Sequence, residues 1–186
     1  MKVLVFASGR GSNFEAILNA EKQGVVPIKT VGLLCDRDCN AINIARSFNV
    51  PVTTIKAKDY STKEKHTEAL VDAVKFYAPD YILLAGYMRI IPKELIDIYP
   101  LKIINIHPSL LPKFKGKDAI KQAWDAGVKT TGVTVHFIND KIDDGPIIIQ
   151  ESISVPQTIE ALEKKIHEVE HRLYVKAIKL LNEGKL

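Results

Sequence analysis

The sequence predicts an α/β fold in which helices cover both faces of an open, twisted and mainly parallel sheet. Short apolar runs alternate with amphipathic segments along most of the chain, as they do in successive βα units. The last two runs alternate apolar and polar residues instead, which is typical of half-exposed strands. We therefore expect an antiparallel C-terminal edge, formed as a hairpin or as paired edge strands, and then one long C-terminal helix.

Periodicity and helix-end signals place the individual elements. Apolar runs of strand length occupy residues 2–7, 29–34, 52–55, 81–85, 102–106, 131–138 and 146–154. Helical segments occupy residues 13–23, 61–77, 92–99, 118–126 and 158–182. Ser61 and Glu64 have the S-x-x-E spacing of a capping box, and Pro79 forbids continuation of that helix. Pro92 suits the first turn of the next one.

The last helix carries a regular apolar stripe. Its members follow one another at steps of 4, 3, 4, 4 and 3, and they are Leu162, Ile166, Val169, Leu173, Ala177 and Leu180. His167 and Glu170 lie on the flank of this stripe, so both can point along a surface toward a cleft. A solvated helix face is the alternative for these two residues.

The composition indicates one globular domain over residues 1–186, with 46% hydrophobic and 26% charged side chains. No apolar run approaches the roughly 20 residues needed to cross a bilayer. The N-terminus has no cleavable signal pattern. We therefore expect a cytoplasmic protein without a membrane partner.

The net charge of +4 is spread along the chain, whereas nucleic-acid binders concentrate their charge in a patch. We therefore expect no nucleic-acid partner, and a small anionic ligand remains compatible with the excess. Cys35 and Cys39 are interpreted as reduced thiols, because no second cluster of cysteine or histidine completes a zinc site. We expect no metal.

The loop "SGRGSN" between the first strand and the first helix resembles a dinucleotide fingerprint only in part. Gly9 and Gly11 match G-x-G-x-x-G, but Phe14 occupies the third glycine position, which serves close helix–strand packing. Asp36 stands at the end of the second strand, where a ribose-binding acid would belong. A helix N-terminus with Gly11, Ser12 and Asn13 suits one phosphate monoester better than a pyrophosphate. The alternative is that Ser12 or Asn13 only caps the helix.

The stretch "NIHPSLLPKF", residues 105–114, carries the strongest chemical signal. Asn105 and His107 are two residues apart at the end of a strand, so their side chains share one face. A histidine can move a proton, and an asparagine N–H can donate to a developing oxyanion. Asp143 or Asp144, in the "DDGP" turn, can supply a carboxylate to orient the ring. No serine or cysteine nucleophile adjoins the histidine, which favours direct attack by a substrate amine. A structural role for His107 is the alternative.

Three segments together, "INIHPSLLP", "TGVTVHF" and "DDGPII", resemble the formyltetrahydrofolate-dependent transferases and hydrolases. The resemblance runs from end to end. The segments "GSN" and "LAGYMRI" and the chain length resemble the members of purine synthesis that formylate glycinamide ribonucleotide. This resemblance implies a Rossmann-like sheet order and 10-formyltetrahydrofolate as a co-substrate, with no tightly bound cofactor and no metal. The protein would be a monomer or a homodimer.

The resemblance also implies a role for individual residues. His107 would be the general acid/base, Asn105 would polarise the formyl oxygen, and Asp143 would tune His107 and help to shuttle protons. The ribonucleotide would contact Gly11, Ser12, Asn13, His167 and Glu170. Formyltetrahydrofolate would contact Lys63, Met88, Arg89, Ile90, Ile91, Asn105, Asn139, Asp140 and Asp143.

The chain departs from the family pattern in several places. Lys115 stands where many relatives have proline, Asp144 where some have glycine, and Lys63 where some have arginine. The second departure makes the acid assignment ambiguous by one residue, although alignment to Gly145-Pro146 favours Asp143.

Rival interpretations remain open. A deformylase of the same folate would carry an N-terminal regulatory domain, whereas here the first strand begins at residue 2. A formyltransferase of methionyl-tRNA would carry a C-terminal RNA-binding domain, whereas this chain ends at residue 186. A non-catalytic nucleotide-binding module would explain the glycine loop and leave Asn105, His107 and Asp143 unexplained.

Overall fold

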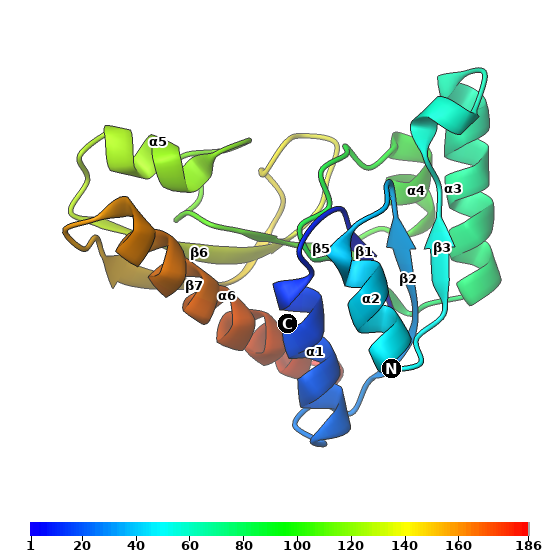
Figure 1. Ribbon diagram of the computed structural model, residues 1–186, viewed down its shortest axis with the longest axis horizontal. Helices are drawn as coiled ribbons and strands as arrows, with labels where there is room; N and C mark the ends of the chain where they lie inside the picture. The colour runs from blue at the N-terminus through cyan, green and yellow to red at the C-terminus, as the bar shows by residue number, and fades with distance from the viewer. Residues whose placement is uncertain (186) are drawn as a thin grey trace.

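The computed structural model describes residues 1–185 and shows one twisted sheet with helices on both faces (Figure 1). The strands are β1 (Lys2–Ala7), β2 (Lys29–Cys35), β3 (Val52–Thr54), β4 (Tyr81–Leu84), β5 (Ile103–His107), β6 (Thr130–Phe137) and β7 (Ile147–Ser154). The helices are α1 (Ser12–Lys22), α2 (Asn40–Ser47), the short 3-10 helix η1 (Ala57–Asp59), α3 (Lys63–Tyr77), α4 (Lys93–Ile98), α5 (Ala119–Asp125) and α6 (Ile159–Asn182).

The strand order within residues 1–185 is β3-β2-β1-β4-β5-β6-β7. The pairs from β3 to β5 are parallel, whereas β5–β6 and β6–β7 are antiparallel. The prediction of a mainly parallel sheet with an antiparallel C-terminal edge is therefore confirmed. The order reverses between β1 and β4, and loops that follow such neighbouring strands form the usual ligand crevice of an open α/β sheet.

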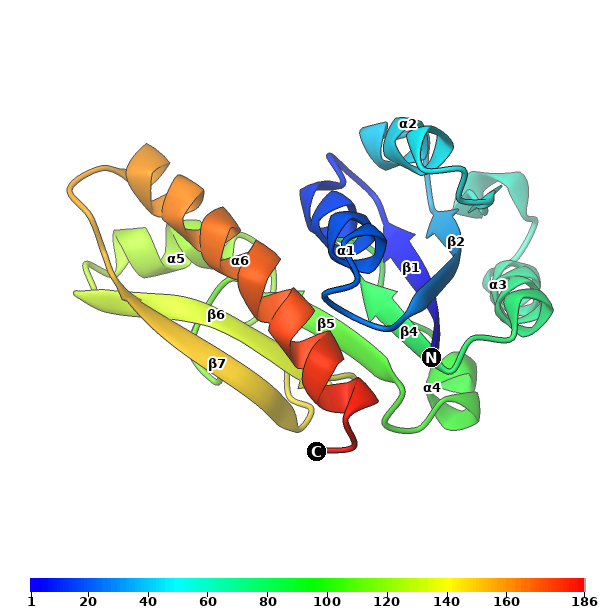
Figure 2. The ribbon, with the colours of Figure 1, turned by 90° about the horizontal axis from the view of Figure 1, so that it is seen from below.

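Two apolar cores lie on opposite faces of the sheet. One core joins α1, α2 and α6 to the sheet, with Phe14, Leu173 and Tyr174 among its buried members. The other joins α3 and α4 to the opposite face, with Leu70 and Leu95 among its members. Figure 2 shows α1 and α6 side by side over one face, with α3 away from them at the β2 side of the sheet.

One helix was missed, and the start of another needs correction. The helix α2 was not predicted, because its buried side chains are the small Ala41 and Ala45 and because no side chain caps its start. The predicted capping box at Ser61 is wrong by one residue. Thr62 is the N-cap, and its hydroxyl accepts from the backbone N–H of Lys65 at 3.2 Å.

The exposure predicted for two segments is also wrong in part. Strand β6 is buried at almost every position instead of half-exposed, because β5 and β7 flank it and α6 packs against it. In the last helix the stripe includes Leu181, which is buried, whereas Leu180 is only half-buried. The stripe also widens to include Tyr174 and Ile178, since α6 faces the sheet and α1 at once.

Tyr174 ties α6 to the middle of the sheet. Its ring is fully buried, and its hydroxyl lies 3.1 Å from the carbonyl oxygens of Leu84 in β4 and Ile104 in β5. Burial raises the pKa of this phenol well above its usual range, so the hydroxyl remains a donor. Its single hydrogen anchors the helix beside the strand that carries Asn105 and His107.

Replacing Tyr174 with phenylalanine should lower the free energy of unfolding by about 1–3 kcal/mol, because buried carbonyl oxygens lose a donor while the packing is retained. Urea denaturation monitored by circular dichroism measures this change. Tyr60→Phe is the matched control, since Tyr60 is only half-buried after η1. An equal effect of the two substitutions would contradict the anchoring role.

Candidate active site

The antiparallel pairing of β5 with β6 brings polar side chains together within the sheet. In its register Asn105 faces His136, and His107 faces Thr134. The Asn105 Nδ2 atom lies 3.3 Å from His136 Nε2. Asn105 is half-buried and His107 is buried, so both are shielded from bulk water but remain next to the loops that follow the strands.

Asp143 completes this group from the loop between β6 and β7. Its Oδ2 atom lies 3.3 Å from His107 Nδ1, and its Oδ1 atom lies 3.6 Å from His136 Nε2. The backbone N–H of Gly116 donates to Oδ2 at 2.8 Å. Asp143 has a positive φ of 47°, a conformation that costs a non-glycine residue free energy and therefore needs support from its surroundings.

His136 is arranged as a neutral ring. Its Nδ1 lies 2.9 Å from the carbonyl oxygen of Phe137, which can only accept, so Nδ1 carries the proton and donates. Its Nε2 then accepts from the amide nitrogen of Asn105. Burial lowers the pKa of His136, in agreement with this assignment, although the Phe137 carbonyl and the charge of Asp143 act in the opposite direction. His136 therefore fixes which way the Asn105 amide points and leaves its second N–H available.

Both ring nitrogens of His107 face acceptor oxygens. Nε2 lies 2.8 Å from the carbonyl oxygen of Phe114, and Nδ1 faces the carboxylate of Asp143. The ring can therefore donate from both sides. Proton exchange with a substrate requires one of these contacts to open, and Phe114 belongs to the loop that precedes α5.

The two neighbouring acids of the "DDGP" turn have different partners. Asp144 forms an ion pair with Lys115 on the molecular surface, and this hydrogen bond lowers the pKa of the Asp144 carboxyl. Asp143 instead faces His107. Of the two candidate carboxylates, the structure thus brings only Asp143 to the histidine among the described residues.

The loop before α1 leaves its helix N-terminus available for an anion. Gly11 is the N-cap at φ 83°, and no side chain caps the helix, so the alternative that Ser12 or Asn13 caps it is wrong. A Cβ atom at Gly11 would lie 2.9 Å from Ala41 Cα and 2.9 Å from Ile44 Cδ1, so α2 leaves no room for a side chain there. The Oδ1 atom of Asn13 is buried without a hydrogen-bond partner in residues 1–185, so this side chain retains bonding capacity for a ligand.

The dinucleotide alternative finds no support in the geometry. Phe14 is fully buried in the core between α1 and the sheet. The Asp36 carboxylate is paired with the Arg37 guanidinium at 2.7 Å instead of being presented to a ribose. Burial alone would raise the pKa of Asp36, but hydrogen bonds from Arg37 and Ser8 outweigh it and lower the pKa.

His167 and Glu170 are brought to the same loop by the packing of α6 on α1. The Nδ1 atom of His167 lies 2.7 Å from Glu170 Oε2, and its Nε2 atom lies 3.1 Å from a guanidinium nitrogen of Arg10. Glu170 is only 6% exposed, so the prediction of a solvated helix face does not hold for it. Of the two side chains on the helix flank, His167 therefore contacts the glycine loop directly, and Glu170 is joined to it through His167.

The residues predicted to contact the folate lie in four separate segments, one of which is β5 with Asn105. Met88 and Ile90 are exposed large hydrophobic side chains, at 68% and 80%, whereas Ile91 is buried in the core below α4. Asn139 and Asp140 lie in the loop of Asp143, where Asn139 Oδ1 accepts from the backbone N–H of Lys141. Lys63 lies apart, exposed in the first turn of α3.

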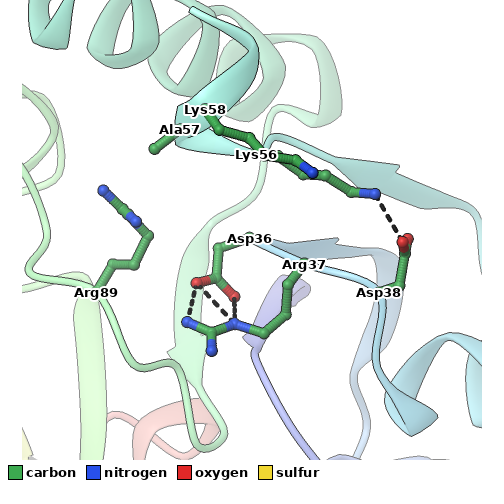
Figure 3. A pocket seen from close by; sticks show the side chains of 7 residues that line it. All are labelled: Asp36, Arg37, Asp38, Lys56, Ala57, Lys58 and Arg89. Carbon is green, nitrogen blue, oxygen red and sulfur yellow. Dashed lines mark hydrogen bonds and ion pairs between the residues drawn. The ribbon is translucent and has the colours of Figure 1, made fainter.

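Arg89 borders a charged pocket of about 370 Å³ at the carboxyl ends of β2 and β3. Figure 3 shows Arg37 turned to Asp36 and Lys56 turned to Asp38, with Arg89 on the other side of the pocket. This pocket does not include Asn105, His107 or Asp143.

The sequence interpretation missed His136, and it left open whether Arg10 contacts the phosphate or faces solvent. A signal existed for His136, because it is two residues from Thr134 in an otherwise apolar alternating strand. No local signal connects Arg10 to His167, since they are 157 residues apart. Within residues 1–185, no group of His, Cys, Asp or Glu side chains is arranged to hold a metal ion. No helix in that range is long and apolar enough to cross a bilayer.

Comparisons with known proteins agree on one group of relatives. Residues 1–178 match the family described as formyl transferase. A phosphoribosylglycinamide formyltransferase of Bacillus subtilis (strain 168) is 43% identical over 97% of this chain and 94% of its own length. The crystal structure of glycinamide ribonucleotide transformylase 1 from Geobacillus kaustophilus superimposes with a TM-score of 0.94, at 46% identity over 97% of each chain. That of the Symbiobacterium toebii transformylase gives 0.95 at 37% identity, over 99% of this chain and 88% of the other.

The buried neutral His136 predicts a pH dependence of stability. Its pKa is lowered in the folded chain, whereas the unfolded chain titrates near about 6.5. Between these values the unfolded chain binds more protons, so the stability from His136 is complete above about pH 6.5 and is lost as the pH falls. His136→Gln should therefore show a smaller loss of unfolding free energy than the unsubstituted chain between about pH 7.5 and about pH 5.5.

Urea denaturation at the two pH values measures this difference. The comparison uses the change in unfolding free energy between the two pH values. A loss of packing that destabilises the variant equally at both pH values therefore cancels. Equal changes in the variant and the unsubstituted chain would contradict the assignment of a neutral His136.

Proposed function

Because the chain belongs to the formyl transferase family, we propose that it transfers the formyl group of 10-formyltetrahydrofolate to the amine of N1-(5-phospho-D-ribosyl)glycinamide. The products are the N2-formyl compound and tetrahydrofolate, and the reaction is a step of purine biosynthesis. The observation that carries the proposal is the cluster of Asn105, His107 and Asp143, in a chain whose near-full-length relatives are named for this activity.

The proposed chemistry is direct attack of the substrate amine on the formyl carbon. The nitrogen–carbon bond forms first and gives a tetrahedral intermediate, whose oxygen carries the negative charge. The free N–H of the Asn105 amide donates to that oxygen, and the bond to His136 Nε2 holds the amide in the required orientation. Collapse of the intermediate then breaks the bond to the folate nitrogen.

His107 moves the proton that this exchange requires. The attacking amine loses one proton, and the departing folate nitrogen gains one, so a group that can accept and donate in turn is sufficient. Asp143 stabilises the protonated ring from the Nδ1 side. We assign the substrate exchange to the Nε2 side, which requires the Phe114 carbonyl to give way as the substrate binds.

The substrates lie on the two loops at the switch point of the sheet. The ribose phosphate binds at Gly11, Ser12 and Asn13, where the N-terminal N–H groups of α1 are unused by side chains. The hydroxyl of Ser8 accepts from the Met88 N–H at 2.8 Å, so the phosphate loop and the folate loop are held together.

The remaining contacts follow the same assignment. His167 and Glu170 contact the ribonucleotide, with Glu170 at the ribose hydroxyls. The folate lies against Lys63, Met88, Arg89, Ile90, Ile91, Asn139 and Asp140. We further propose that residues 1–186 form one catalytic domain, that the enzyme is a cytoplasmic monomer or homodimer, and that it acts on small molecules without a metal.

Mixing the protein with 10-formyltetrahydrofolate, with and without glycinamide ribonucleotide, tests the proposed reaction. Absorbance reports the release of tetrahydrofolate, and mass spectrometry identifies the formylated product. Release should require the ribonucleotide and match product formation one to one. Release without the ribonucleotide would indicate a hydrolase, and no release in either mixture would indicate a binding module.

The acid/base assignment predicts that His107→Asn and Asp143→Asn each lower kcat by about 10²- to 10⁴-fold, the usual contribution of a positioned proton-transfer group. Binding of the ribonucleotide, measured by calorimetry, should change little. Asp144→Asn is the matched control because it removes the neighbouring carboxylate, which pairs with Lys115 instead of His107. An Asp144→Asn loss as large as that of Asp143→Asn would contradict the assignment.

A further inference from the structure

Arg10 is a charged residue in the glycine loop to which the proposed reaction gives no role. It directly precedes Gly11, the N-cap of α1. Its backbone carbonyl accepts from the Asn40 side-chain amide at 2.9 Å. Its guanidinium donates to His167 Nε2 at 3.1 Å. Arg10 is therefore held by two helices. Asn40 of α2 bonds to its backbone carbonyl, and His167 of α6 bonds to its exposed guanidinium.

The chemistry of the partners fixes the protonation of the ring between Arg10 and Glu170. A guanidinium has donors and no acceptor, so His167 Nε2 must carry a lone pair. An ionised Glu170 can only accept, so His167 Nδ1 must carry the proton. His167 is therefore a neutral imidazole in this chain of hydrogen bonds.

The chain of hydrogen bonds from Arg10 through His167 to Glu170 leaves the positive charge of Arg10 without a paired carboxylate. The guanidinium is held by a neutral acceptor, and the ring of His167 separates it from the buried carboxylate of Glu170. Among residues 1–185 no ion pair joins Arg10 to a carboxylate, whereas Arg37 and Arg172 each have one. Four further guanidinium N–H groups of Arg10 stay available beside the open N-terminus of α1.

From this arrangement we propose that Arg10 is a ligand of the substrate phosphate and the residue that selects phosphorylated over unphosphorylated substrate. His167 and Glu170, besides their proposed contacts with the ribonucleotide, position its guanidinium. The inference rests on the proposed function for the identity of the substrate. The ligand chemistry is a phosphate monoester dianion, which needs more charge than the helix N-terminus supplies. A pre-positioned guanidinium provides it with little ordering cost on binding.

The kinetic test compares glycinamide ribonucleotide with its unphosphorylated riboside. Arg10→Gln should raise KM for the ribonucleotide by about tenfold or more, as expected for loss of a charged hydrogen bond, with a much smaller effect on kcat. The loss should be confined to the phosphorylated substrate, so the ratio of kcat/KM for ribonucleotide over riboside should fall by about the same factor.

Arg46→Gln is the matched control, because it makes the same change of residue type and charge at an exposed position at the end of α2. His167→Ala should lower the same ratio, and His167→Gln should restore part of it, since an amide supplies both an acceptor for Arg10 and a donor for Glu170. An equal loss with both substrates in Arg10→Gln would indicate that Arg10 only fastens α6 to the loop, and would overturn the proposal.

A binding test separates this inference from the proposed reaction. Ribose 5-phosphate and ribose serve as the probes, and calorimetry measures their binding without any turnover. The unsubstituted chain and Arg46→Gln should bind ribose 5-phosphate about tenfold or more tightly than Arg10→Gln does. Loss of that difference, or no binding of ribose 5-phosphate by the unsubstituted chain, overturns the inference. Absence of formyl transfer with the binding difference intact overturns only the proposed function.

Discussion

The antiparallel pairing of β5 with β6 is the constraint on which the rest of the site depends. It sets Asn105 against His136 and His107 against Thr134. The Thr134 hydroxyl in turn donates to the Ser109 carbonyl at 2.7 Å and accepts from the Leu111 N–H, so the strand partner also fixes the loop that follows His107. A shift of register by one residue would turn every one of these side chains to the other face, which is why the geometry is strongly specified.

The carboxylate that faces His107 depends on contacts from outside the sheet. Asp143 is in a left-handed conformation, and the Gly116 N–H and the neighbouring Lys115–Asp144 ion pair join its loop to the loop before α5. Lys115 and Asp144 are two of the three positions at which the sequence interpretation expects a departure from the family pattern, the third being Lys63. Lys115 and Asp144 form an ion pair with each other, so each of these residues has its partner in the other loop.

The glycine-loop end of the candidate site, where we propose that the phosphate binds, is assembled by a different interaction, the packing of α6 along α1 and the sheet. Tyr174 anchors α6 through the carbonyls of Leu84 and Ile104. One turn earlier the same helix carries Glu170, which holds His167, and His167 in turn contacts Arg10 of the glycine loop. One face of α6 thus packs into the core, and its flank contacts the glycine loop. Because α1 and α6 share a core, the loop and the polar side chains of α6 are held in fixed relation.

The sequence by itself determined the fold class and the place of every strand within residues 1–185, and it predicted the candidate residues Asn105, His107 and Asp143. Strand and helix periods arise from neighbours a few residues apart, so they can be read locally, and a period of two is enough to place Asn105 with His107. Phe14 likewise argued against the dinucleotide loop from its position alone. Only the tertiary structure placed Asp143 against His107 and Asp144 against Lys115. It also showed that β6 is buried, that His136 contacts Asn105 and that Arg10 contacts His167. Each of those results depends on strand register or helix packing between segments far apart in the chain. A local pattern of residues does not show which distant segments will contact each other.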